Sequence, residues 1–141
     1  MAITTTDWLT VDGDVSGNGV KHQCKITYDN VGTNASTPAF NWAVMGDFTV
    51  ILENRDTDSD LLDAEDDVDV WFEASVDGIN YFLIYEEENV LGDGDNTGFH
   101  VYDFDSKGLF PHMRITLDPD GTIGNPDIHN IFVTVVPHHM V

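Results

Sequence analysis

The sequence predicts an all-β fold, a single antiparallel β-sandwich of about eight strands with jelly-roll or immunoglobulin-like topology. Three observations support this prediction. Apolar and polar residues alternate with a period of two in most segments between residues 20 and 136, as in half-buried strands. Clusters of Asp, Gly, Asn and Pro separate these segments. No long segment shows the 3.6-residue period of a helix.

The alternation is most regular in residues 20–28. Cys24 and Tyr28 fall on an apolar face of this predicted strand, whereas Lys21 and Lys25 fall on a polar face. Such a pattern is typical of a strand with one wet face. Similar patterns predict further strands at residues 38–44, 48–53, 68–76, 79–86, 99–104, 112–117 and 131–136.

A turn signal lies in the middle of the chain. The pair Asp77 and Gly78 separates two apolar runs, and this pair is a strong hairpin signal because both turn positions favour positive φ. We therefore expect residues 68–76 to pair with residues 79–86. The expected core includes Phe72, Leu83, Met113, Ile115 and Val133.

The length of 141 residues corresponds to one domain. Residues 20–141 are expected to form the sandwich, and residues 1–19 an N-terminal arm or a first strand. The first residues lack the basic start and apolar run of a signal peptide, and no apolar stretch approaches the length of a membrane span. We therefore expect the chain to be made in the cytoplasm of a host cell.

The charge is the most unusual property of the composition. Asp and Glu number 26 against 5 Lys and Arg, for a formal net charge of −21. A protein that binds nucleic acid or an anionic membrane needs a stripe of basic residues. This chain cannot supply one, so both partners are excluded. Self-repulsion of this size weakens at about 1 M salt, where the Debye length is about 3 Å. The composition fits a halophilic or marine source and equally the soluble surface of a particle.

The sequence lacks the residue patterns that commonly carry catalysis. The sequence contains no Gly-x-Ser-x-Gly elbow and no His-x-His or His-Glu-x-x-His spacing. Cys24 lies on the apolar face of its strand, which favours a small buried hydrophobe over a nucleophile. Arg114, one of two arginines, is expected to anchor a structural ion pair. We therefore expect a protein that is not an enzyme; a glycosidase built on paired carboxylates is the weakest alternative.

One acidic segment suggests calcium. Asp56, Asp58 and Asp60 have the one-three-five spacing of calcium-binding loops. Leu61 stands where such a loop needs glycine, and Asp67 stands where it needs glutamate. A solvated acidic loop is therefore favoured over a calcium site, and no other cofactor is expected.

Two segments carry a resemblance to a known class of proteins. Residues 70–81 (VWFEASVDGINY) contain a Ser-x-Asp-Gly turn before an aromatic residue, and residues 113–117 (MRITL) place an apolar residue before Arg114 in a strand. In these features the chain resembles small β-sandwich head-decoration (cement) proteins of tailed bacterial or archaeal viruses. These proteins share no catalytic motif, so the resemblance assigns no functional residues.

The resemblance implies a non-enzymatic virion protein that decorates and stabilises the outer capsid surface by bridging major capsid subunits. Its partners would be the major capsid protein and further copies of itself, as a homotrimer. The N-terminal segment supplies four apolar candidates for contact with the capsid or a neighbouring copy, namely Ile3, Trp8, Leu9 and Val11.

The alternative function is a carbohydrate- or receptor-binding β-sandwich module of a viral fibre or tail. In this alternative Trp8, Trp42 or Trp71 would stack on sugars, although Trp42 and Trp71 lie in predicted strands where burial competes with display.

Overall fold

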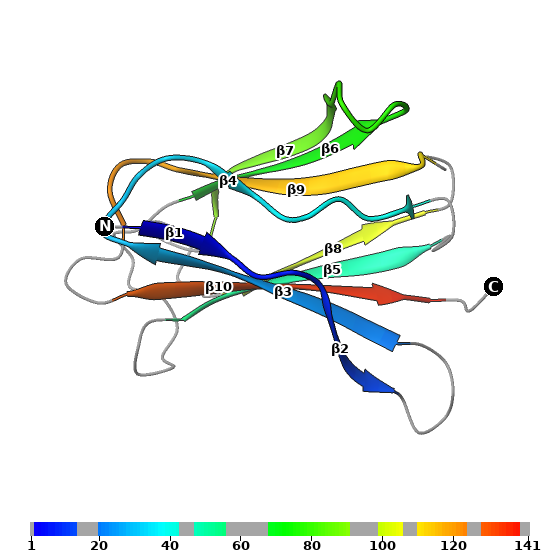
Figure 1. The fold of residues 1–141 in the computed structure, drawn as a ribbon, viewed down its shortest axis with the longest axis horizontal. Coiled ribbons are helices and arrows are strands. Elements are labelled where there is room, and N and C mark those ends of the chain that lie inside the picture. Colours follow the sequence, from blue (N-terminus) through cyan, green and yellow to red (C-terminus); the bar gives the residue numbers. More distant parts are fainter. Residues whose placement is uncertain are drawn as a thin grey trace.

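The chain folds into two antiparallel sheets packed face to face, which confirms the predicted β-sandwich (Figure 1). The computed structural model describes residues 2–13, 20–42, 47–55, 68–90, 99–105, 110–123 and 128–138. Across these ranges no helix is long and apolar enough to cross a membrane. The strands are β1 (Ala2–Thr5), β2 (Leu9–Gly13), β3 (Val20–Asp29), β4 (Ala35–Ser36), β5 (Phe48–Arg55), β6 (Val68–Ser75), β7 (Phe82–Val90), β8 (Phe99–Phe104), β9 (His112–Pro119) and β10 (His129–Pro137).

The strands pair in a nested order around the turn between β6 and β7. β6 pairs with β7, β5 with β8, β4 with β9 and β3 with β10, always antiparallel. The chain is thus one long hairpin, rolled so that successive pairs alternate between the two sheets. This arrangement is that of a jelly roll, which decides between the two predicted topologies.

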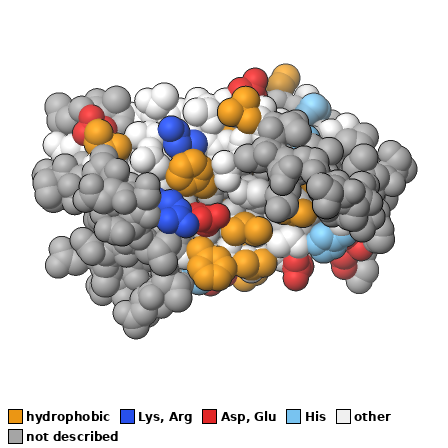
Figure 2. Space-filling view, turned by 90° about the horizontal axis from the view of Figure 1, so that it is seen from below, with side chains coloured by type: hydrophobic (Ala, Val, Ile, Leu, Met, Phe, Trp, Pro, Cys, Tyr) orange, Lys and Arg blue, Asp and Glu red, His pale blue; other side chains and the backbone are white. Residues whose placement is uncertain are grey.

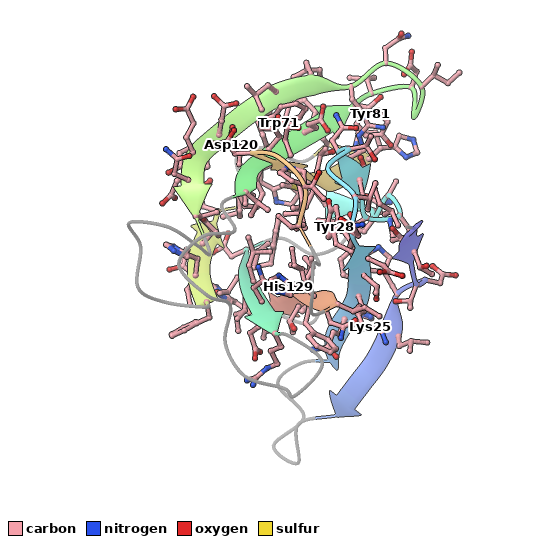
Figure 3. All side chains as sticks on the ribbon, turned by 90° about the vertical axis from the view of Figure 1, so that its left-hand side faces the viewer. Lys25, Tyr28, Trp71, Tyr81, Asp120 and His129 are labelled. Carbon is pink, nitrogen blue, oxygen red and sulfur yellow. The ribbon has the colours of Figure 1, made fainter. Side chains whose placement is uncertain are left out.

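Of the strands in the described ranges, six form one sheet and four form the other. The six-stranded sheet has the order β1-β3-β10-β5-β8, and β2 also pairs with β3. The four-stranded sheet has the order β4-β9-β6-β7. β8 and β7 therefore end the two sheets on the same side of the sandwich, as Figure 3 shows.

The core lies between the sheets and follows the period-two patterns of the sequence. Along β5 and β6 buried and partly exposed residues alternate, and the buried positions carry apolar side chains except at Asn54 and Ser75. Tyr28 lies between the sheets in Figure 3. Phe48 stacks on Phe104 with ring centroids 5.1 Å apart, and Phe72 lies 4.8 Å from Phe104, so aromatic rings join the two sheets.

The turn after β6 is held by the side chain of Asp77. Its Oδ1 accepts hydrogen bonds from the backbone N–H groups of Ile79 and Asn80, both at 2.8 Å, and from Ser75 Oγ at 2.9 Å. Gly78 takes a positive φ of 79°, but Asp77 does not, so one of the two turn positions behaves as predicted. The Ser-x-Asp-Gly segment is therefore a self-bonded turn.

The structure corrects two of the expected strand positions. The strand predicted at 38–44 is replaced by the short β4 and a single bridge between Phe40 and Met113, while residues 43–46 lie outside the described part. The second hairpin strand begins at Phe82 instead of residue 79, because the turn extends to Asn80.

The predicted core is correct at Phe72, Met113, Ile115 and Val133, which are fully buried, but it is wrong at Leu83. A register shift between Phe72 and Glu73 places Leu83 opposite Glu73, a residue of the outer face. The shift turns Leu83 toward solvent.

Candidate functional site

The predicted N-terminal contact residues lie on the edge of the six-stranded sheet. β1 and β2 pair side by side with β3, and Ile3 and Trp8 pack against the core. Trp8 Nε1 donates to the carbonyl oxygen of Pro38 at 2.8 Å. Leu9 is exposed, and the backbone of Val11 lies in β2. Ile3 and Trp8 thus face the core, whereas the side chain of Leu9 faces solvent.

The three tryptophans do not line up as a platform for sugars. Trp42 is buried and meets Phe48 edge to face at 5.3 Å. Trp71 lies on the outer side of β6 with its Nε1 buried, and Trp8 is half-buried. Trp8 and Trp42 are connected through the rings of Phe40 and Phe48, whereas Trp71 lies on the outer side of the other sheet.

The acidic segment with Asp56, Asp58 and Asp60 lies outside the described residues. In the ranges that the structure describes, no group of three or more His, Cys, Asp or Glu side chains is placed to hold a metal ion.

Cys24 has the environment of a structural residue. Its side chain is buried in the core, and burial, with a smaller effect from the charge of Asp7, raises the pKa of the thiol to about 12. At neutral pH the thiol is protonated and is therefore a poor nucleophile.

The outer face of the six-stranded sheet carries a patch that sequence reasoning missed. We call it the apolar face. Its rows follow from the strand register: Lys25, Phe132, Glu53 and Phe99 are neighbours across four strands, as are Gln23, Thr134, Ile51 and Val101.

The apolar face exposes large hydrophobic groups at its β8 end. Phe99 is 50% and Val101 is 52% exposed, and Ile51 and Phe132 are partly exposed beside them. Figure 2 shows hydrophobic side chains gathered on this face around basic ones. Contiguous apolar groups of this kind mark interaction surfaces more often than scattered ones do.

Two basic side chains lie on the same face. Lys25 lies beside Phe132, and Arg55 forms an ion pair with Glu53 at 2.9 Å. These are two of the five basic residues of the chain.

The outer face of the four-stranded sheet is acidic by contrast. Asp69 of β6 lies directly opposite Asp118 of β9. Desolvation, followed by the charges of Asp69 and Asp120, raises the pKa of Asp118 above its ordinary value. This outer face also carries Trp71, the exposed Leu83 and Arg114, and it differs from the apolar face in its facing carboxylates.

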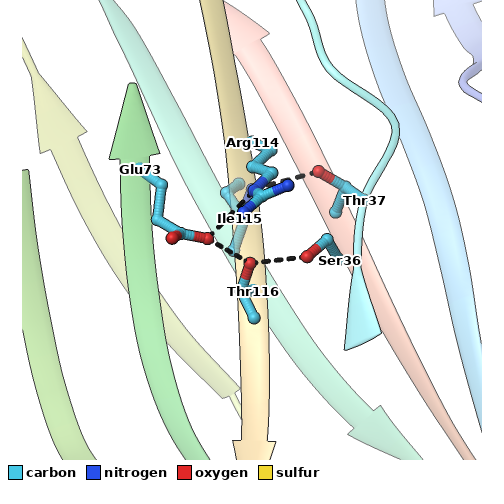
Figure 4. A network of polar contacts seen from close by, with 6 residues as sticks. All are labelled: Ser36, Thr37, Glu73, Arg114, Ile115 and Thr116. Atoms are coloured by element: carbon cyan, nitrogen blue, oxygen red, sulfur yellow. Dashed lines mark hydrogen bonds and ion pairs between the residues drawn. The ribbon is translucent and has the colours of Figure 1, made fainter. Parts of the chain in front are cut away.

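Arg114 forms the predicted ion pair on this acidic face (Figure 4). Its Nε donates to Glu73 Oε1 at 3.0 Å, and its guanidinium lies 3.9 Å from the ring centroid of Tyr81. Thr116 also donates to Glu73 Oε1 and shares a hydrogen bond of 2.7 Å with Ser36. Because the groups are paired with one another, the network is structural.

The signal for the apolar face was present in the sequence. Residues 131–136 (IFVTVV) and 99–104 (FHVYDF) carry apolar or aromatic groups at both odd and even positions. A strand with one wet face would alternate, so such runs indicate that both faces are covered.

Comparison with known proteins adds no family assignment. No protein-family model and no curated protein sequence matches the chain. Among solved structures, a glycoside hydrolase family 43 arabinoxylan arabinofuranohydrolase from Bacillus subtilis aligns with a TM-score of 0.40 and 13% identity. A glycoside hydrolase domain of Endo-D from Streptococcus pneumoniae R6 aligns with a TM-score of 0.29 and 9% identity. Each alignment covers 94% of this chain, which spans 23% and 21% of those chains respectively.

Proposed function

We propose that this domain is a non-enzymatic virion protein that decorates the outer surface of a capsid and stabilises it by bridging major capsid subunits. The observation that carries the proposal is the polarity of the sandwich. One outer face is apolar with basic residues, and the other carries facing carboxylates. In the proposed arrangement the apolar face lies on the shell and the acidic face points to solvent.

The energetics favour contact through the apolar face. Burying a large apolar side chain contributes about 1.5–3 kcal/mol, so Phe99 and Phe132 are suitable anchors. Leu9, from the N-terminal segment, is a further exposed apolar group on β2 of the same sheet. The ion-paired Glu53 and Arg55 lie beside the anchors, where polar groups commonly surround an apolar centre.

The net charge of −21 limits how copies can approach one another. Acidic faces repel at close range, so a homotrimer on the shell would keep these faces apart and directed outward. The same charge keeps the decorated particle soluble.

The first experiment asks whether the chain is part of a particle. Mass spectrometry of virus particles purified by density gradient from the source organism should identify this chain in a fixed ratio to the major capsid protein. If such particles contain the capsid protein but not this chain, the proposal is wrong.

The second experiment asks which face is used. Undecorated particles are mixed with the protein and sedimented. Phe99→Asp should abolish cosedimentation, whereas Leu83→Asp, at a residue 53% exposed on the other sheet, should leave it unchanged. The two residues are similarly exposed, so equal effects of the two substitutions would exclude docking through the apolar face. Thermal unfolding of each variant establishes that the fold is intact.

A further inference from the structure

An open groove runs along the side of the sandwich where β7 and β8 end the two sheets. A hollow of about 530 Å³ is lined by Tyr85 and Glu87 from β7 and by residues 100–104 of β8. A second hollow, of about 340 Å³, shares Asp103 and Phe104 with the first. The two hollows adjoin at these two residues, and we refer to them together as the groove.

Aromatic rings line the first hollow. Tyr85 is exposed, and its ring centroid lies 6.2 Å from that of Tyr102 in an edge-to-face arrangement. His100 stacks on Tyr102 at 6.1 Å. Phe72 lies behind both tyrosines, with centroids 5.9 Å from Tyr85 and 4.9 Å from Tyr102. These contacts hold the rings in place before any ligand arrives.

Carboxylates border the rings. Glu87 approaches His100 Nδ1 at 4.0 Å, and Asp103 accepts a hydrogen bond of 2.6 Å from Thr49. The second hollow adds Asp47 and Asp105. No Lys or Arg is found among the described residues that line either hollow. The groove therefore combines aromatic faces with negative charge.

We propose that this groove binds an extended basic segment of a partner protein, with a Lys or Arg side chain against the Tyr85 ring and near Glu87. Rings attract cations through their negative faces, and the adjacent carboxylate supplies a counter-charge. An extended segment presents alternate side chains on the same side, roughly 6.7 Å apart, so we propose that a second basic side chain lies at the adjoining acidic hollow. The inference rests on the groove, which borders the apolar face at Val101.

The chemistry of the groove favours a cation over other ligands. A purely apolar segment would remove water from the carboxylates of Glu87 and Asp103 without supplying a cation, which is costly. An anionic ligand would be repelled by the same carboxylates. A neutral oligosaccharide could stack on the rings but would not neutralise the carboxylates.

The test measures binding of a fluorescein-labelled peptide that alternates Lys and Thr, followed by fluorescence anisotropy with the full chain. The control peptide carries Glu in place of Lys. Glu87→Gln and Tyr85→Leu should each weaken binding about tenfold, and Tyr85→Phe, which keeps the ring, should bind as the parent does. Glu86→Gln removes the same charge from the same strand on the outer face, opposite Trp71, and should change affinity little.

Thermal unfolding of each variant separates loss of the site from loss of the fold. Equal weakening by Glu86→Gln and Glu87→Gln would show diffuse attraction to an acidic protein and would overturn the proposal. Binding that survives in a folded Tyr85→Leu variant would overturn it as well. Binding of neutral oligosaccharides on a glycan array, together with their displacement of the peptide in competition, would also overturn the proposal. Those results would assign the groove to sugars.

Discussion

Glu73 on β6 lies directly opposite Arg114 on β9, and Arg114 Nε donates to Glu73 Oε1 over 3.0 Å. The carboxylate of Glu73 is largely shielded from water, with its side chain 14% exposed. The pair joins the two central strands of the four-stranded sheet on its outer face.

Replacing Arg114 with Met should lower the free energy of unfolding by about 1–2 kcal/mol, since it leaves the Glu73 carboxylate without its cation. Urea denaturation measures the loss. The double variant Arg114→Met with Glu73→Gln should recover part of it, because the uncompensated charge is gone. Strict additivity of the two single substitutions would contradict a coupled pair.

Asp77 should make the turn sensitive to acid. Hydrogen bonds from the Asn80 and Ile79 backbone, and then from the Asn80 and Ser75 side chains, lower the pKa of the Asp77 carboxyl far below its ordinary value. Because the folded-state pKa is depressed, the ionised carboxylate stabilises the fold above the unfolded-state pKa of about 4. This contribution is lost progressively as pH falls from that value through the folded-state pKa. Asp77→Asn should therefore lower the melting temperature at neutral pH, and the difference from the parent should shrink in acid. A difference that does not change with pH would contradict this account.

Asp118 should behave in the opposite sense. Its pKa is raised, so its ionised form disfavours the folded state at neutral pH, and this cost disappears when the group is protonated in both states. Asp118→Asn should stabilise the protein by about 0.5 kcal/mol at neutral pH and by nothing well below pH 4. Sodium chloride at about 1 M should reduce the gain, since the Debye length is then about 3 Å. Melting curves over pH and salt test both effects.

The corrected core makes a paired prediction. Ile115 is fully buried, so Ile115→Ala should cost about 2–5 kcal/mol. Leu83 is exposed, so Leu83→Ala should change stability by less than about 0.5 kcal/mol. Chemical denaturation of the two variants measures both losses of unfolding free energy. Equal losses would contradict the strand register.

The β-sandwich could be predicted from the sequence because the patterns that indicate it are local. Alternation along β5 and β6 and the Asp77 turn both depend on residues close together in the chain. The position of Leu83 was not predictable in this way, since it depends on a register shift between β6 and β7. The predicted pairing of Arg114 with an acid was correct, but its partner could not be chosen among 26 acids without the strand register.

The candidate surfaces were harder to predict for a related reason. The apolar face combines side chains of β3, β5, β8 and β10, which are separated in sequence and become neighbours through the nested pairing. The groove likewise needs one edge strand from each sheet. Individual aromatic residues in these strands could as well have been core residues, and Tyr102 indeed is one.

The most direct test of docking through the apolar face is hydroxyl-radical footprinting, read by mass spectrometry, of the free and particle-bound protein. Phe99 on the apolar face is 50% exposed and Phe82 on the four-stranded sheet is 43% exposed, so the two rings should oxidise at similar rates in the free protein. On the particle, Phe99 should be protected while Phe82 continues to oxidise. Protection of Phe82 with continued oxidation of Phe99 would contradict the proposed orientation.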